Sequence, residues 1–199
     1  MKRIKIWNDS PSEKQLDEIC AMIEHGEIGL FPTDTIYGIC CDALNVKAIE
    51  RICKLKGINP EKAHLSIVCS DIAMAADYSK INNQAFQMLK QYTPGPFTFL
   101  LNSASSLPKA FKGRKIVGVR IPDNETIRKV AERLNHPLLT TSIEFEDDDY
   151  AVNPDLIAES YENDVDFMVE GEEGGTIPST IVDLSQGEVE IVREGKGEL

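Results

Sequence analysis

The hydrophobic positions along the chain follow two patterns that alternate for most of its length. In the stretch 12–26, Leu16, Ile19, Cys20 and Ile23 recur at helical spacing, which predicts an amphipathic helix with one buried face. The same spacing predicts three further helices, over 43–56, 82–91 and 125–135.

Short apolar runs between these stretches predict strands. They read EIGLF, HLSIVCS, FTFLLN, KIVGVRIPD, PLLTTSI, VDFMVEG, STIVDLS and EVEIVREG, and turn-forming residues separate them. Because strands alternate with helices and the chain ends in a strand-rich tail, we predict a mixed α/β sheet with helices packed against it. We expect one domain over residues 1–199.

Composition is typical of a globular protein. The chain has 199 residues, of which 42% are hydrophobic, so it can bury a substantial core. No apolar run approaches the roughly 18 residues that span a membrane, and the start, MKRIKIWNDS, lacks the apolar centre of a signal peptide. We therefore expect a cytoplasmic protein that does not insert into a membrane.

Charge is unevenly distributed along the chain. The formal net charge of −12 argues against strong non-specific binding to nucleic acid. Residues 144–173 contain many carboxylates and neither lysine nor arginine, whereas basic residues gather in 47–62 and 109–120. A local binding site for an anion is therefore still compatible with the sequence.

Metal chemistry has little support in the sequence. The five cysteines include one adjacent pair and no CxxC, and the three histidines are far apart. We expect reduced, mostly buried cysteines and no metal site made by the protein alone.

Polar residues gather where several predicted strands end. PTDTIYG follows the strand EIGLF, Arg120 ends VGVR, and Thr140, Thr141 and Ser142 end another strand. Ligands of open α/β sheets bind at such strand ends. Each feature also has a purely structural explanation. PTDTIYG could simply form a turn, and Arg120 could be one half of an ion pair.

Seven motifs in a fixed order resemble the YrdC/YciO family. They are PTDTIYG, KLKGINPEKAHLSIV, YTPGPFTFLL, VGVRIP, LLTTS, PSTIVDL and VREG, and the likeness runs from about Gly26 to Gly195. The resemblance implies a single α/β domain whose twisted sheet forms a concave cleft. The characterised enzymes of the family make threonylcarbamoyl-AMP from threonine, bicarbonate and ATP, as the first step in a tRNA modification; binding to double-stranded RNA has also been described.

The resemblance also implies roles for individual residues. Thr35 and Tyr37 would line the amino-acid end of the cleft, Lys56 would meet the nucleotide phosphates, and Lys62 lies in the following basic loop. Mg²⁺ would arrive with ATP. The remaining cleft residues would be Thr98, Arg120, Thr141, Ser142, Ser179, Thr180 and Arg193, with Lys56, Arg120 and Ser142 assigned to catalysis.

Three positions depart from the pattern of the synthases. The arginine of a Lys-x-Arg signature is missing, whether the signature aligns with Lys56-Gly57-Ile58 or, in a shifted register, with Lys54-Leu55-Lys56. Glu144 replaces the asparagine of Ser-x-Asn, and Cys69 replaces a histidine. A carboxylate beside a polyphosphate repels it unless a cation bridges the two. These departures resemble the YciO branch of the family and imply weak or altered activity.

Two functional hypotheses follow from the sequence. The first is a nucleotide-binding protein of threonylcarbamoyl-AMP chemistry that uses ATP or AMP and a small amino acid. The alternative is a non-catalytic module that binds tRNA or double-stranded RNA, or associates with the ribosome. The acidic stretch EFEDDDY, which follows Ser142, is expected to be a solvated loop near the cleft.

Overall fold

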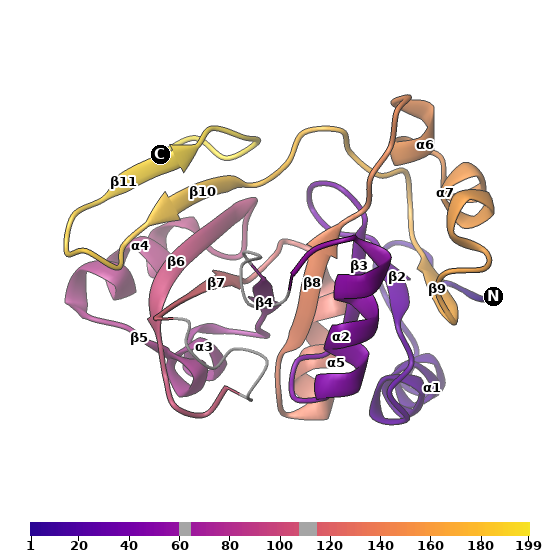
Figure 1. Ribbon diagram of the computed structural model, residues 1–199, viewed down its shortest axis with the longest axis horizontal. Helices are drawn as coiled ribbons and strands as arrows, with labels where there is room; N and C mark the ends of the chain where they lie inside the picture. The colour runs from indigo at the N-terminus through magenta and orange to yellow at the C-terminus, as the bar shows by residue number, and fades with distance from the viewer. Residues whose placement is uncertain (60–64, 108–114) are drawn as a thin grey trace.

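One mixed sheet runs across the width of the molecule (Figure 1). The computed structural model of the protein describes residues 1–59, 65–107 and 115–199, so Lys62 lies outside the described residues. Within these ranges, ten of the strands follow the order β1-β9-β2-β3-β8-β4-β7-β6-β10-β11, and β5 pairs with β6. Parallel pairs such as β4 with β7 and β6 with β10 occur beside antiparallel pairs such as β3 with β8, which confirms the predicted mixed sheet.

The strands are short, as expected from the apolar runs. Their bounds are β1 Lys2–Lys5, β2 Gly29–Phe31, β3 Gly38–Asp42, β4 Ser66–Val68, β5 Ser79–Lys80, β6 Phe97–Ser103, β7 Ile116–Arg120, β8 Leu138–Ser142, β9 Phe167–Glu170, β10 Thr180–Asp183 and β11 Glu190–Arg193.

Helices cover both faces of the sheet. Their bounds are α1 Glu13–Glu24, α2 Val46–Leu55, α3 Ile72–Tyr78, α4 Asn83–Tyr92, α5 Glu125–Leu134, α6 Asp149–Val152 and α7 Pro154–Tyr161. The helices α1 and α5 pack against each other behind β3 and β4, and α2 covers the opposite face of β3 (Figure 1).

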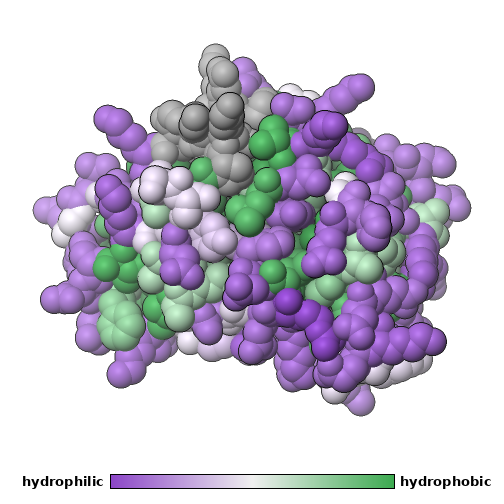
Figure 2. Space-filling model, turned by 90° about the horizontal axis from the view of Figure 1, so that it is seen from below, coloured by the Kyte–Doolittle hydropathy of each residue, from purple (hydrophilic) through white to green (hydrophobic). Residues whose placement is uncertain are grey.

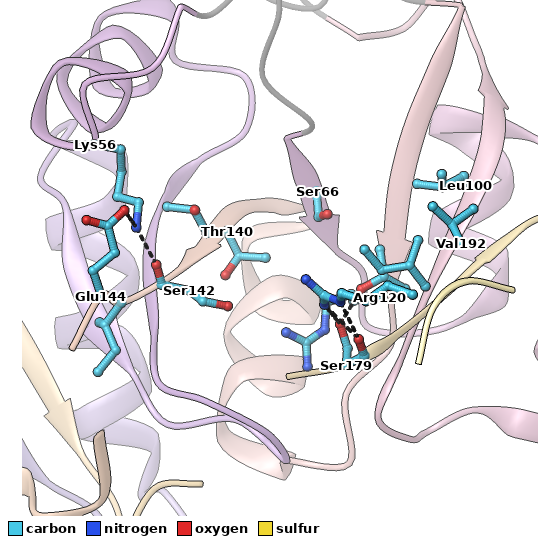
Figure 3. Close-up of a pocket in the computed structure, with 14 residues that line it drawn as sticks. Lys56, Ser66, Leu100, Arg120, Thr140, Ser142, Glu144, Ser179 and Val192 are labelled. Atoms are coloured by element: carbon cyan, nitrogen blue, oxygen red, sulfur yellow. Dashed lines mark hydrogen bonds and ion pairs between the residues drawn. The ribbon is translucent and has the colours of Figure 1, made fainter. Parts of the chain in front are cut away.

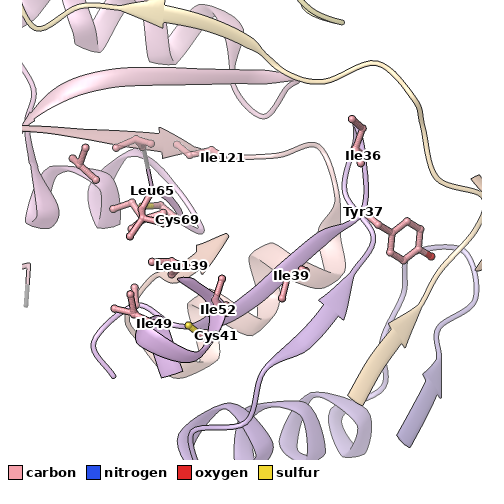
Figure 4. Close-up of a cluster of buried hydrophobic side chains, with 14 of the residues drawn as sticks. Ile36, Tyr37, Ile39, Cys41, Ile49, Ile52, Leu65, Cys69, Ile121 and Leu139 are labelled. Carbon is pink, nitrogen blue, oxygen red and sulfur yellow. The ribbon is translucent and has the colours of Figure 1, made fainter. Parts of the chain in front are cut away.

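The strand β3 shows why both faces of the sheet are apolar. Successive side chains of a strand point to opposite faces. Ile39 and Cys41 join Ile49 and Ile52 of α2 in one buried cluster (Figure 4), whereas Cys40 joins the cluster formed with α1 and α5. Because β3 is buried on both sides, its sequence does not alternate between polar and apolar residues, and the pattern analysis did not predict it as a strand.

The other elements absent from the prediction have local explanations. The edge strand β1 exposes three of its four residues, and β5 has only two residues. The segment 144–173 was expected to begin with a solvated loop, and residues 144–148 do lie outside helices and strands. Further on, Asn153 caps α7, and Pro154 occupies its first turn.

The five cysteines are buried, as expected, and the structure gives them as thiols rather than disulfides. Burial raises the pKa of Cys20 to about 11 and that of Cys40 to about 12. These side chains are therefore neutral thiols at neutral pH and serve as small apolar core residues.

The surface has the mixed character expected of a chain that is 27% charged. The face shown in Figure 2 is mainly hydrophilic, with small apolar patches between polar side chains. Among the helices in the described ranges, none combines the length and the apolar character needed to cross a membrane.

Candidate functional site

A cavity of about 500 Å³ opens where several strand ends meet (Figure 3). Its lining comes from the end of α2, from β4, β6, β7 and β8, and from the hairpin of β10 and β11. The lining residues are Lys56, Ser66, Thr98, Leu100, Arg120, Thr140, Thr141, Ser142, Ile143, Glu144, Ser179, Ile181, Val192 and Arg193.

Seven of the residues expected in the cleft therefore meet in one cavity. They are Lys56, Thr98, Arg120, Thr141, Ser142, Ser179 and Arg193. These residues are far apart in the sequence and are brought together by the order of the strands. The proximity of their side chains is a finding, whereas the catalytic or binding role of each stays a prediction.

A glycine makes room for part of this lining. Gly118 of β7 lies opposite Ser66 of β4. A Cβ atom at position 118 would come within 2.5 Å of the Ser66 hydroxyl and 3.2 Å of a Thr98 methyl group. Only a residue without a side chain fits between these two polar residues, which explains the glycine of the VGVR motif.

One end of the cavity carries Lys56, the residue that caps the C-terminus of α2. Its Nζ donates a hydrogen bond to the Ser142 carbonyl oxygen at 2.9 Å and forms an ion pair with Glu144 Oε1 at 2.6 Å. The Lys56 side chain is 11% exposed, whereas that of Glu144 is 75% exposed. The lysine is therefore fixed at the wall of the cavity, and its carboxylate partner faces water.

The backbone of Glu144 is also held in place. Its amide nitrogen donates to the Tyr161 hydroxyl at 2.9 Å, and that hydroxyl lies 3.2 Å from the Glu144 carbonyl oxygen. Tyr161 belongs to α7, so the acidic segment positions the carboxylate that pairs with Lys56.

Ile58 has a structural role beside this end of the cavity. Gly57 adopts a left-handed conformation with φ of 61°, and the Ile58 amide donates to the Cys53 carbonyl oxygen at 2.9 Å. This pattern ends a helix and places an apolar side chain on its last turn. Ile58 packs against the core and is not among the lining residues.

The other end of the cavity is built on Arg120, whose residue is 5% exposed. Its Nη2 donates to Asp34 Oδ1 and to Thr35 Oγ1, both at 2.9 Å. Burial lowers the pKa of the guanidinium, and the Asp34 carboxylate opposes that shift. Arg120 lines the cavity, as expected of a cleft residue, and it also forms the ion pair that was the structural alternative, with the buried Asp34.

Arg193 lines the cavity from the hairpin of β10 and β11. Its Nη2 donates to the Ser179 carbonyl oxygen at 2.7 Å, and the Ser179 hydroxyl lies 2.8 Å from Thr98 Oγ1. Burial lowers the pKa of Arg193. Two strand-end hydroxyls and the guanidinium of the exposed residue Arg193 therefore form a polar group on one wall.

Three residues predicted for the cleft are not among the described residues that line this cavity, and their binding roles stay predictions. Thr35 holds Arg120, as described above. The Tyr37 hydroxyl accepts from the Gly171 amide and donates to the Glu172 carbonyl oxygen, both at 3.1 Å, and burial raises its pKa to about 12. The Thr180 hydroxyl donates to the Gly197 carbonyl oxygen at 2.6 Å. All three residues are almost fully buried; the Tyr37 and Thr180 hydroxyls bind backbone atoms, whereas the Thr35 hydroxyl binds the Arg120 side chain.

Sequence reasoning missed other members of the site. Ser66 contributes a hydroxyl, Asp34 holds Arg120, and Leu100, Ile181 and Val192 form an apolar wall. Thr140, noted at a strand end but not assigned to the cleft, also lines the cavity. The serine within the apolar run HLSIVCS could have indicated Ser66 as a site residue, because buried strands seldom contain polar residues without a structural or functional reason. The departure at Cys69 lies in the core and outside the lining residues.

The described residues contain no group of three or more histidine, cysteine or acidic side chains that could hold a metal ion. Glu144 is the one acidic side chain among the described lining residues. A cation in this cavity would therefore need ligands from a bound substrate as well.

Known proteins are similar to this chain in both sequence and fold. The Sua5/YciO/YrdC family model, whose description reads "Telomere recombination", matches residues 21–195. The YciO protein of Escherichia coli (strain K12) is 29% identical over 98% of this chain and 95% of its own length. A protein of Methanocaldococcus jannaschii provisionally named threonylcarbamoyl-AMP synthase is 30% identical over 98% of this chain and 93% of its own.

Solved structures agree with these matches. The crystal structure of E. coli YciO superposes with a TM-score of 0.90, at 29% identity, over 100% of this chain and 98% of that one. P. abyssi Sua5 complexed with L-threonine superposes with a TM-score of 0.87, at 25% identity, over 98% of this chain and 58% of that one. The fold is thus the expected YrdC-like one, and the chain belongs to the Sua5/YciO/YrdC family.

Proposed function

We propose that the cavity binds an adenine nucleotide and a small amino acid, and that the chain performs threonylcarbamoyl-AMP chemistry at a weak or altered level. One observation carries this proposal. Lys56, Arg120 and Arg193 come from three separate elements and line the same cavity, together with hydroxyls at the ends of β6 and β8. Adenylyl transfer places charge on phosphate oxygens, which cations of this kind stabilise.

The rest of the lining suits such a ligand. A cavity of about 500 Å³ is within the usual range for small-molecule sites. Leu100, Ile181 and Val192 offer an apolar surface for a base, while Thr98, Thr141 and Ser179 offer hydroxyls that orient polar groups. Arg120 is held rigidly by Asp34, so it presents its charge in a fixed direction.

The relatives support the choice of substrate class. P. abyssi Sua5 has been crystallised with L-threonine, and the M. jannaschii relative carries the name of a threonylcarbamoyl-AMP synthase. Mg²⁺ enters the proposal as part of the substrate, since ATP brings it on its phosphates. Glu144 could complete its coordination, because carboxylate oxygens are preferred ligands of Mg²⁺.

Thermal unfolding with ligands tests the binding part of the proposal. We expect ATP with Mg²⁺ to raise the melting temperature, because a ligand that binds only the folded state stabilises it. The variant Lys56→Met should lose most of that increase, since it lacks the ammonium group predicted to meet the phosphates. The absence of any shift at millimolar ATP with Mg²⁺ and threonine would overturn the proposal.

Product analysis tests the chemistry. The protein is incubated with ATP, threonine, bicarbonate and Mg²⁺, and mass spectrometry follows threonylcarbamoyl-AMP while a coupled assay follows pyrophosphate. We expect slow formation of both products in equal amounts. Nucleotide binding without either product would limit the proposal to binding.

RNA binding stays the alternative. Arg120 suits it poorly, because this residue is 5% exposed and cannot reach the backbone of a duplex. The basic residues 109–114 lie outside the described ranges. A titration of double-stranded RNA at increasing salt distinguishes the two functions: binding that weakens steeply with salt, with no response to ATP, would favour RNA.

A further inference from the structure

Among the described residues, the charges at the cavity are almost balanced. Of the three cations in the described lining, Arg120 pairs with Asp34, and Lys56 pairs with Glu144. No carboxylate of the described residues forms an ion pair with Arg193. These described groups therefore sum to a single positive charge, which is little for binding a triphosphate.

Glu144 is the part of this arrangement that can change most easily. Its side chain is 75% exposed, and an ion pair with so exposed a partner contributes little to stability. The Tyr161 hydroxyl holds its backbone beside the cavity, so the carboxylate remains within reach of a ligand there after it leaves Lys56. Lys56 keeps its hydrogen bond to the Ser142 carbonyl oxygen and so stays beside the cavity.

A nucleotide that carries Mg²⁺ offers a partner to each member of the pair. A phosphate oxygen can replace the carboxylate beside the Lys56 ammonium group. The Glu144 carboxylate can then bind the Mg²⁺ that the nucleotide carries, as oxygen ligands do. Free ATP offers only the first of these partners, and its negative charge lies close to a released carboxylate.

We propose that Glu144 makes nucleotide binding depend on Mg²⁺, by giving up Lys56 to a phosphate and taking the Mg²⁺ of the nucleotide as its new partner. This inference rests on the proposed function and defines which form of the nucleotide the site accepts. Glu144 is then a residue that determines specificity, at the position where the synthases carry an asparagine.

The test compares ATP binding with and without Mg²⁺ by isothermal titration calorimetry. Each protein is titrated with ATP once in excess Mg²⁺ and once in EDTA. For the unaltered protein we expect about tenfold tighter binding in Mg²⁺, a typical size for coupling between two ligands. In Glu144→Gln most of this difference should vanish, mainly because binding in EDTA becomes tighter.

A matched control is available in the same segment. Glu146 is exposed and lies outside the cavity lining, so Glu146→Gln removes the same charge two residues away. It should keep the full Mg²⁺ dependence. AMP, whose single phosphate holds Mg²⁺ weakly, should show little Mg²⁺ dependence with any of the three proteins.

The possible outcomes separate the two proposals. Equal Mg²⁺ dependence in the unaltered protein and in Glu144→Gln would overturn the role of Glu144 while nucleotide binding stands. Loss of the dependence in Glu146→Gln as well would reduce the effect to overall charge and would also overturn it. No binding of ATP or AMP by any of the proteins would overturn the proposed function and this inference together.

Discussion

The two ion pairs of the cavity differ in burial and in what surrounds them. At one end, the Arg120 and Asp34 side chains are 6% and 8% exposed, and Thr35 adds a further hydrogen bond to the guanidinium. At the other end, Lys56 is 11% exposed, but its partner Glu144 is 75% exposed.

Because of this difference, one ion pair is part of the fixed structure and the other can exchange partners. Removing one partner of a buried pair leaves a charge without water or counter-ion, so such a pair must stay intact. A pair with one exposed partner can exchange partners at low cost, because water solvates the released group. We therefore regard the Arg120 end as fixed and the Lys56 end as the part that responds to ligands.

The largest expected effect comes from breaking the fixed end. Arg120→Met leaves the Asp34 carboxylate buried without its counter-ion, and we expect the free energy of unfolding to fall by about 3 to 5 kcal/mol. Chemical denaturation followed by circular dichroism measures this change.

Glu144→Gln is the matched control for that experiment. It breaks the exposed pair, and its effect on the free energy of unfolding should stay within about 1 kcal/mol. Similar losses in both variants would show that the two ends are not different in the way proposed here.

An intermediate effect is expected from Tyr37, which anchors the loop that carries Asp34 and Thr35. Tyr37→Phe removes the partner of the Gly171 amide, and we expect a loss of about 1 to 2 kcal/mol in the free energy of unfolding. Because Tyr37 does not line the cavity, the rise in melting temperature caused by ATP should stay the same. If Tyr37→Phe instead abolished the ATP-induced rise in melting temperature without lowering stability, Tyr37 would have to contact the ligand.

The smallest effect concerns the helix end beside Lys56. Ile58→Arg replaces a half-buried side chain that packs against the core, and we expect a loss of about 1 kcal/mol in unfolding measurements. Ile58→Leu, which keeps an apolar contact, is the control. Neither variant should change the ATP-induced shift, and a larger shift in Ile58→Arg would show that position 58 reaches the ligand after all.

Much of the site could be anticipated from strand ends. Arg120, Thr141 and Ser142 stand at the ends of apolar runs, and the resemblance to a family added Lys56, Thr98, Ser179 and Arg193. The pattern analysis could not tell lining residues from supporting ones. Tyr37 and Thr180 carry the same polar groups as the lining residues, yet their hydroxyls bind backbone atoms. Which way a polar side chain points at a strand end depends on its neighbours in the sheet.

The apolar pattern was enough to predict the fold class and most of the elements, because the spacing of apolar residues reflects the geometry of helices and strands. It also identified the strand ends where ligand chemistry is concentrated. The interaction partners emerged only in the folded molecule: Asp34 for Arg120, Glu144 for Lys56, and a core contact for Ile58. The physical reason is that ion pairs and packing join residues far apart in the chain, such as Lys56 and Glu144, and local patterns contain no information on those distances.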